Sequence, residues 1–189
     1  SPQDRYRISA EKKFAEGEQS LKEWTRESSR AAIDKFKSSL DDWKAVRDRN
    51  AEGQTLRRIG DVYQVLGEYQ NALTFYNQAL SLIRKIRDRG SEGEVLNDLG
   101  CVYNNLGESQ KALNLCTQAL ESGRAFGNQR EEARALNNLG EIYYALGKLQ
   151  QSLDFYKQAL SLWRDSGNRQ GLALTLLNFG YTYSDLGQM

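Results

Sequence analysis

The sequence predicts an all-α fold, an α-solenoid of stacked antiparallel helix hairpins wound into a right-handed superhelix. Three observations lead to this prediction: the chain repeats itself every 40 residues, its apolar residues recur at helical spacing, and glycines punctuate each repeat at constant intervals. Three sets of residues coincide at this period: Gly60, Gly100, Gly140 and Gly180; Gly67, Gly107, Gly147 and Gly187; and Tyr63, Tyr103, Tyr143 and Tyr183.

One repeat unit has the pattern of a helical hairpin. Leu96, Leu99, Tyr103 and Leu106 follow spacings of three, four and three, which places them on one face of a helix. A second helical face follows in the same repeat: Ala112, Leu113, Cys116, Ala119 and Leu120. Gly107 lies between the two sets, where a residue with positive φ would end the first helix and let the chain reverse.

Gly100 needs a different explanation, because it lies inside the first helix of its repeat. A glycine there costs about 1 kcal/mol relative to alanine. We expect this cost to be offset because a missing side chain lets two helix backbones approach closely. Each hairpin also exposes an apolar face that only a neighbouring hairpin can cover, so the repeats are predicted to stack.

The repeats divide the chain into two predicted parts. Residues 1–52 are predicted to form a degenerate N-terminal capping hairpin, with a first helix at Ile8–Trp24 and a connection about three residues longer than in later repeats. Its second helix carries Ala32, Phe36, Leu40 and Trp43 in register with Ala72, Tyr76, Leu80 and Ile83. Residues 53–189 are predicted to form the array, with three full repeats from 53, 93 and 133 and a truncated repeat from 173.

Within the array, helix pairs are expected over 53–88, 93–126 and 131–165, with Gly90, Gly127-Asn128 and Gly167-Asn168 at the turns. One more helix, equivalent to the first helix of a repeat, is expected over 173–186. It presents Leu176, Phe179, Tyr183 and Leu186 toward a second helix that the chain does not contain. We therefore expect the chain to be a piece of a longer array, and this helix to provide a surface for self-association.

The composition excludes several classes of function. With 39% hydrophobic and 27% charged residues, the 189-residue chain suits a soluble globular protein with a real core. Its 26 lysines and arginines balance 25 aspartates and glutamates, so no overall field attracts nucleic acid or an anionic membrane. No apolar run is long enough to cross a membrane, and "SPQDRYRISAEKK" lacks a secretory signal. We expect a cytoplasmic protein that binds neither nucleic acid nor membrane.

The chain also lacks the residues of common catalytic and metal sites. It contains no histidine, so neither a Ser-His-Asp nor a Cys-His site can form within it. Cys101 and Cys116 are the only cysteines, too few for a disulfide framework or for a zinc site without histidine. We expect no enzymatic activity, no metal and no cofactor, with Cys101 toward the groove described below and Cys116 in the core.

The segment "LNDLGCVYNNLGESQKALNLCTQAL" and its two siblings resemble the tetratricopeptide repeat. They share its Leu-Gly, Tyr, Gly, Ala, aromatic and Ala-Leu positions at the family's intervals. Two departures are Leu115 or Cys116 where an aromatic residue is usual, and Ser152 in place of alanine. The unit is also longer than the family's and lacks its closing proline. This longer unit resembles the repeats of kinesin light chains, of GoLoco-motif G-protein regulators, and of bacterial chains that carry a caspase-like domain.

The resemblance implies a non-catalytic scaffold that binds a partner peptide or helix in a concave groove lined by the first helix of each repeat. Carried over position by position, the groove residues are Arg57, Asp61, Gln64, Glu94, Asn97, Cys101, Asn104, Arg134, Asn137, Asn138, Glu141, Tyr144 and Tyr181. Asparagine is a poor helix former, and its amide suits the backbone of an extended peptide. Asn97 and Asn137 are therefore predicted to contact the ligand; the competing interpretation is a solvated polar face.

Other interpretations of the same residues remain. Asp61, Cys101, Glu141 and Tyr181 occupy the place of the first asparagine of a carboxylate clamp, which disfavours recognition of an acidic chaperone C-terminus. The basic run from Arg84 to Arg89 is interrupted by Asp88 and is interpreted as a solvated face. The tyrosines of the repeat are assigned to the core. An alternative function is a regulatory or oligomerisation arm of a larger protein, whose effector domain, such as a caspase-like protease, lies outside this chain.

Overall fold

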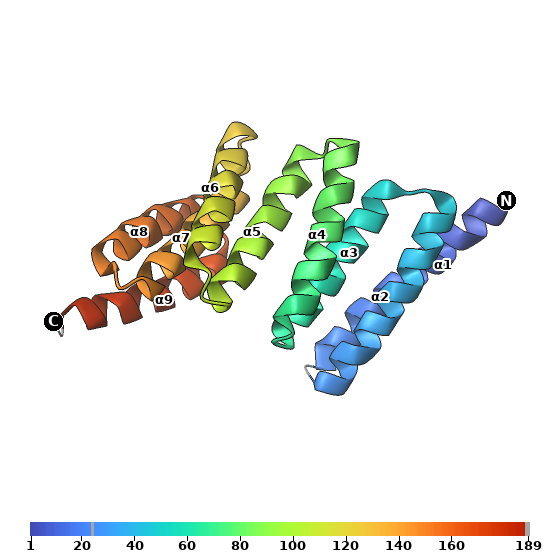
Figure 1. The fold of residues 1–189 in the computed structure, drawn as a ribbon, viewed down its shortest axis with the longest axis horizontal. Coiled ribbons are helices and arrows are strands. Elements are labelled where there is room, and N and C mark those ends of the chain that lie inside the picture. Colours follow the sequence, from blue (N-terminus) through green and yellow to red (C-terminus); the bar gives the residue numbers. More distant parts are fainter. Residues whose placement is uncertain (24, 188–189) are drawn as a thin grey trace. The chain divides into compact units, whose positions relative to one another are not determined.

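A computed structural model describes residues 1–23 and 25–187 of the chain, and its described part is all-α (Figure 1). The chain divides into two compact units, Ser1–Asp88 and Arg89–Met189. Trp24, which the sequence places at the end of the first helix, lies outside the described residues. The predicted all-α class is confirmed in both units, whereas the predicted boundary at residue 52 remains a prediction.

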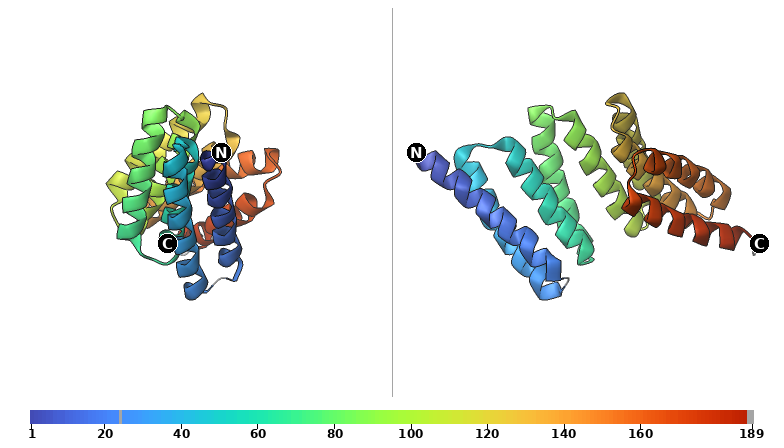
Figure 2. Two further views of the ribbon diagram at one scale, coloured as in Figure 1. Left: turned by 90° about the vertical axis from the view of Figure 1, so that its right-hand side faces the viewer. Right: turned by 180° about the vertical axis from the view of Figure 1, so that it is seen from behind.

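Unit 1 consists of two antiparallel helix hairpins. Its elements are α1 (Pro2–Ser20), a short 3-10 helix η1 (Leu21–Glu23), α2 (Arg26–Val46), α3 (Arg49–Val65) and α4 (Tyr69–Ile86). Helix α1 packs along α2 and α3 along α4, and α2 contacts α3 (Figures 1 and 2). The first hairpin is therefore built as the repeat predicts, with η1 in its longer connection. Ser1 caps α1 through Asp4, so this helix begins before the predicted Ile8.

Unit 2 has the same construction with one further helix. Its elements are α5 (Arg89–Asn105), α6 (Ser109–Ala125), α7 (Gln129–Ala145), α8 (Leu149–Asp165) and α9 (Arg169–Gly187). Helix α5 pairs with α6 and α7 with α8, while α9 packs on α8 and touches α7. Contacts between α5 and α7 and between α7 and α9 bring successive first helices together. We call these two interfaces the seam between α5 and α7 and the seam between α7 and α9. Their residues form much of the candidate site.

In the three hairpins after the first, a glycine sets the turn between the two helices. Gly67, Gly107 and Gly147 have φ of 75°, 76° and 70°, values that glycine reaches without a steric penalty. The Gly67 N–H donates to the Gln64 carbonyl, and the following Glu68 N–H donates to the Tyr63 carbonyl. These two hydrogen bonds satisfy carbonyl groups that the end of a helix leaves without partners. The predicted reversal at these glycines is confirmed.

The glycine inside the first helix of each of the four hairpins marks a close helix crossing. A Cβ built on Gly60 would lie 2.6 Å from the ring of Tyr76, and one on Gly17 would lie 2.6 Å from Phe36. A Cβ built on Gly100 would likewise clash with Cys116, and one built on Gly140 would clash with Tyr156. The predicted role of these glycines is confirmed, and it extends to the degenerate first hairpin.

The turns between hairpins differ from the sequence prediction at one place. Gly127 and Gly167 have positive φ as expected, but the turn between α4 and α5 is made at Arg87, with φ 59°. Gly90 lies inside the first turn of α5, so its assignment to the turn is wrong. The first helices also begin earlier than predicted, at Arg49 and Arg89. Asp48 explains the first case, because its side chain accepts the Ala51 N–H and caps α3.

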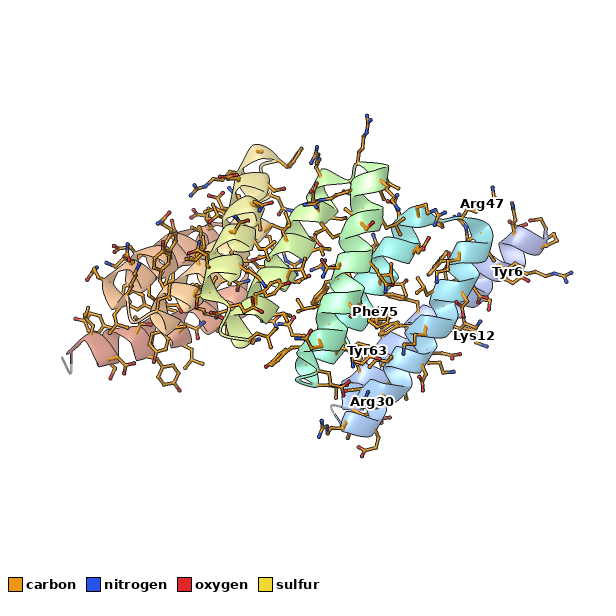
Figure 3. The ribbon with its side chains drawn as sticks, in the orientation of Figure 1. Tyr6, Lys12, Arg30, Arg47, Tyr63 and Phe75 are labelled. Carbon is orange, nitrogen blue, oxygen red and sulfur yellow. The ribbon has the colours of Figure 1, made fainter. Side chains whose placement is uncertain are left out.

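The tyrosines at the 40-residue period have different surroundings. Tyr63 is buried and stacks on Phe75 with ring centroids 5.5 Å apart (Figure 3). Tyr143 stacks on Phe155 at 5.1 Å. Tyr183 is 64% exposed, so its assignment to the core is wrong. Helix α9 has no partner on that side in the described residues, and a Cβ on Gly180 would meet nothing within 4 Å.

Candidate functional site

In unit 1, the predicted groove residues Asp61 and Gln64 surround the hydroxyl of Tyr76. This hydroxyl reaches past Gly60 from α4 and lies 2.8 Å from Asp61 Oδ1 and 2.9 Å from Gln64 Oε1. Arg57, the third predicted residue of α3, is half-buried and has contacts of its own. The three residues therefore lie on the first helix of the second hairpin, where the repeat places them.

Sequence reasoning missed Arg58, which joins α3 to α1. Its guanidinium donates to both oxygens of Glu18, at 2.5 and 2.8 Å, and to Asp61 at 3.3 Å. Pairing with Glu18 raises the pKa of Arg58. These charges border a cavity of about 350 Å³, whose lining residues are Glu18, Leu21, Lys22, Ser29, Arg58, Asp61, Val62 and Val65. The signal was available, because Glu18 and Arg58 lie 40 residues apart at the repeat period.

In unit 2, the seam between α5 and α7 is closed by an ion network. Arg134 Nη2 donates to Asp98 Oδ1 at 2.7 Å, and Arg134 Nη1 donates to Glu131 Oε2 at 3.1 Å. Both carboxylates are buried. Arg134 was predicted to line the groove, but its guanidinium is held between two helices of the protein itself. The charges on this seam are therefore satisfied internally.

An amide pair completes the same seam. Asn138 Nδ2 donates to Asn97 Oδ1 at 2.8 Å, while the Asn97 Nδ2 group is buried without a hydrogen-bond partner. Asn97 is 0% exposed and Asn137 is 5% exposed. Packing between first helices takes these side chains out of reach of a ligand, which argues against their predicted role in peptide contact. The same packing involves Asn138, which is half-buried.

The seam between α7 and α9 carries a continuous chain of hydrogen bonds. Trp163 Nε1 donates to Thr175 Oγ1 at 3.1 Å, and the Thr175 hydroxyl donates to Asn137 Oδ1 at 3.0 Å. Asn137 Nδ2 then donates to Glu141 Oε1 at 2.8 Å. Asn178 Nδ2 reaches the same oxygen from α9, also at 2.8 Å. This chain ends on a carboxylate.

Glu141 has an unusual environment for a charged group. Among the described residues no lysine or arginine forms an ion pair with it, and the side-chain amides of Asn137 and Asn178 donate hydrogen bonds to it. Burial raises the pKa of Glu141, although the hydrogen bonds from Asn137 and Asn178 favour its charged form. The carboxylate is thus held in place by neutral donors and lacks a counter-charge.

Exposed aromatic side chains lie beside this carboxylate. Tyr144, one turn after Glu141 on α7, is 40% exposed and donates its hydroxyl to Asp185 Oδ2 at 2.7 Å. Tyr181, one turn after Asn178 on α9, is 61% exposed. Asp185 raises the pKa of the Tyr144 hydroxyl. Both tyrosines lie on first helices and are accessible, and their role in a groove stays a prediction.

The other predicted residues of unit 2 lie on α5. Cys101 and Asn104 are half-buried, and the Oδ1 atom of Asn104 is buried without a partner. Glu94 is also half-buried and has contacts of its own. Cys116 is buried in the core as predicted, and burial raises the pKa of its thiol. We define the first-helix face of unit 2 as Cys101, Asn104, Glu141, Tyr144 and Tyr181.

The described part of the chain offers neither a metal site nor a membrane-spanning helix. Within residues 1–23 and 25–187, no group of three or more histidine, cysteine, aspartate or glutamate side chains could hold a metal ion. Nor does any described helix combine the length and apolar character needed to cross a membrane. The side chains of the first-helix face of unit 2 are one carboxylate, one amide, one thiol and two tyrosine rings.

Comparison with models of protein families identifies the type of repeat. The model of the tetratricopeptide repeat matches residues 51–125 and 131–189. The chain belongs to the tetratricopeptide repeat family. No curated protein has significant sequence similarity to it. The family resemblance of the repeat motif is therefore confirmed.

Solved structures share this fold at low sequence identity. BtubC from P. vanneervenii has a TM-score of 0.66 at 17% identity, covering 99% of this chain and 85% of that one. Aspartyl phosphate phosphatase F from Bacillus subtilis has a TM-score of 0.85 at 15% identity, covering 100% and 49%. A putative kinesin light chain from Podospora anserina has a TM-score of 0.70 at 15% identity, covering 100% and 89%.

A Rap protein complexed with Competence and Sporulation Factor gives a TM-score of 0.80 at 20% identity. The alignment covers 90% of this chain and 48% of the Rap protein, so the chain spans about half the length of that relative. At these identities the likeness shows the tetratricopeptide fold alone.

Proposed function

We propose that this tetratricopeptide protein is a non-catalytic interaction module that binds a partner peptide on the first-helix face of unit 2. The observation that carries the proposal is Glu141, a carboxylate without a cationic partner in the described residues. A lysine or arginine of the bound peptide would supply the missing charge. The module would therefore select peptides with a cationic side chain.

The environment of Glu141 makes such a contact selective. Asn137 and Asn178 both donate to Oε1, which fixes the orientation of the carboxylate before a ligand arrives. Partial burial weakens the screening by water, so a charge-assisted hydrogen bond there is stronger than one on an open surface. Preorganisation also lowers the entropy lost on binding.

The two exposed tyrosines extend the same surface. Rings of Tyr144 and Tyr181 can contact the stem of a lysine or the plane of an arginine guanidinium, a contact worth about 0.5 to 1 kcal/mol at exposed sites. Asp185, bonded to the Tyr144 hydroxyl, adds a second carboxylate. This combination favours a basic peptide over an acidic one.

A peptide-selection experiment tests the proposal. The purified chain is incubated with an array of random peptides, and enrichment of lysine and arginine is scored. Binding of a selected peptide is then measured by calorimetry for the wild type and for Glu141→Gln, which keeps the shape and removes the charge. We expect a loss of about 1.5 to 3 kcal/mol, the usual value of a hydrogen bond to a charged group.

The matched control is Asp154→Asn, which removes an exposed carboxylate from α8, outside the first-helix face. This variant should bind the selected peptide as the wild type does. Absence of lysine and arginine from the selected peptides, or equal affinity for Glu141→Gln and wild type, would contradict the proposal. The Rap protein structure supports its general form, because a tetratricopeptide fold there holds a bound factor.

The exposed apolar surface of α9 favours a second candidate function, self-association. Its exposed apolar side chains are Leu174, Leu176, Leu177, Tyr181 and Tyr183. Burying each would contribute about 1.5 to 3 kcal/mol, enough to pair two copies of the helix. The chain would then act as an oligomerisation arm, the alternative predicted from the sequence. An effector domain on the same polypeptide would be controlled through that association.

Sedimentation equilibrium distinguishes this second function from the first. The apparent mass should rise with protein concentration, and Leu176→Glu should abolish the rise. The control is Val65→Glu, which changes an exposed residue of α3 in unit 1. A mass that stays that of one chain at every concentration would rule out self-association through α9.

A further inference from the structure

A row of basic side chains in unit 1 lies apart from the first-helix faces. It occupies the α2–α3 turn and the neighbouring end of α4. We define the basic strip by its five members: Arg7, Lys44, Arg47, Arg49 and Lys85. Figure 3 shows Arg47 at the turn that follows α2. The basic run predicted near Arg84 was interpreted as a solvated face, but that interpretation did not include the residues contributed by α1, α2 and α3.

Two adjoining hollows open along the strip. The first has a volume of about 450 Å³, and its lining residues are Lys44, Arg49, Glu52, Leu56, Asn77, Gln78, Ser81, Leu82 and Lys85. The second has a volume of about 430 Å³, and its lining residues are Arg7, Val46, Arg47, Asp48, Arg49, Asn50, Ile86 and Asp88. Arg49 lines both hollows, so a ligand that fills them must be extended.

The charges in these hollows are only partly neutralised. Arg7 pairs with Asp48 at 3.1 Å, and Arg49 pairs with Glu52 at 2.8 Å. Lys44, Arg47 and Lys85 are exposed and form no ion pair within the described residues. Three cations, one in the second hollow and two in the first, thus remain available for a ligand.

The backbone at Arg47 adds a second observation. Arg47 has φ 59°, a left-handed conformation that disfavours any residue with a Cβ. Arg87, one period later, has the same φ, whereas Gly127 and Gly167, two and three periods later in unit 2, adopt positive φ without this cost. Both turns thus carry a basic side chain where glycine would relieve the backbone, and the Arg47 side chain lines the second hollow.

We infer that the basic strip binds an acidic segment of a partner protein. An extended peptide can place separate carboxylates against Lys44 and Lys85 in one hollow and Arg47 in the other, and pass the carboxylates of Asp48, Glu52 and Asp88 with uncharged residues. A nucleic-acid strand fits less well, because its phosphates repeat at every nucleotide and would meet these three carboxylates. Neither hollow is lined by an aromatic ring on which a base could stack.

The inference is tested with a fluorescein-labelled peptide of alternating glutamate and serine, followed by fluorescence anisotropy. We expect the full chain to bind it, with an affinity that falls as salt is raised. The double substitution Lys44→Gln and Lys85→Gln should weaken binding about threefold to tenfold, because each exposed charge contact contributes only modestly. The control removes two lysines elsewhere, Lys12→Gln and Lys157→Gln, and should leave the affinity unchanged.

A second variant separates binding from folding. Arg47→Gly should weaken peptide binding while the melting temperature stays equal or rises, because glycine relieves the left-handed backbone. Unchanged affinity in both the double lysine variant and Arg47→Gly would overturn the inference. So would a single-stranded oligonucleotide that binds more tightly than the peptide and depends on the same residues. Failure of the Glu141 experiment would leave this result unaffected, since that site lies in unit 2.

Discussion

The seam between α5 and α7 and the seam between α7 and α9 use equivalent positions but differ in charge balance. On the first seam, Arg134 neutralises two buried carboxylates. On the second, Leu174 stands in the position of Arg134, and Glu141 stands in that of Cys101. One seam therefore satisfies its own charges, while the other leaves a carboxylate without a cation from residues 1–23 and 25–187.

This difference shows how one backbone plan can carry two arrangements of charge. The repeat positions the same polar sites on every first helix, and substitutions at two of them decide whether a seam neutralises its own charges. Asn97 illustrates the consequence. Its counterpart Asn137 bonds to Thr175 and Glu141, whereas Asn97 has Ala135 and Cys101 at those places and retains an unpaired amide N–H.

The largest expected effect comes from giving the first seam the residue of the second. Arg134→Leu copies Leu174 and leaves Asp98 and Glu131 buried without their cation. Removing one partner of a buried ion network typically costs about 3 to 5 kcal/mol, so we expect this loss in the free energy of unfolding by urea. The reverse change, Leu174→Arg, lies on an exposed position and should alter stability by less than about 0.5 kcal/mol. Equal stability of both variants would contradict the assigned network.

A smaller effect is expected from packing inside the hairpins, where α9 again differs from the helices before it. Gly100→Leu would force a side chain into the crossing with Cys116, and such overpacking typically costs about 1 to 3 kcal/mol. Gly180→Leu, at the same position of α9, meets open space and should lack this penalty. The measurement is thermal melting of the two variants side by side. A melting temperature unaffected by Gly100→Leu would show that the crossing is looser than the structure indicates.

The smallest effect concerns the pH dependence of the second seam. Burial raises the pKa of Glu141 above its value in the unfolded chain, so the folded protein binds this proton more tightly. The stability associated with protonated Glu141 is therefore present at acid pH and is lost as pH rises through the folded pKa. Glu141→Gln stays neutral and can still accept the two amide hydrogen bonds.

We expect Glu141→Gln to melt at a higher temperature than the wild type at neutral pH, with the difference shrinking as pH falls toward the ordinary glutamate range. Asp154→Asn, on an exposed carboxylate, provides the control and should show no such trend. A Glu141→Gln protein that melts lower than wild type at neutral pH would indicate that the carboxylate has a cation partner after all.

Periodicity predicted the hairpins well because the residues that build them contact one another within one repeat. Gly100 and Cys116, for example, lie 16 positions apart and recur as Gly60 with Tyr76. The seams between first helices were harder to predict. Asn97 and Asn137 have the spacing of a solvent-facing stripe on their own helices, but both are buried in unit 2, where successive first helices contact each other.

The same reason explains why the sequence analysis did not predict two residues that join successive first helices. Arg58 and Asp98 contact partners in another repeat, and a single repeat gives no sign of those contacts. The predicted position of Tyr183 in the core was wrong for the opposite reason, because its periodicity was correct but the helix that covers Tyr143 has no equivalent in the described residues. The sequence predicted the position of each residue within its repeat, but it did not predict whether a neighbouring helix covers that residue.

The intrinsic fluorescence of Trp163 can report on the structure of unit 2. Its indole N–H bonds to Thr175, one of only two buried residues in the described part of α9. Few buried side chains hold this helix, so it should open at a lower denaturant concentration than the hairpins before it. Opening would expose the Trp163 indole to water and shift its emission to longer wavelength. With Trp24 and Trp43 replaced by phenylalanine, that fluorescence change would separate detachment of α9 from unfolding of the rest of the chain.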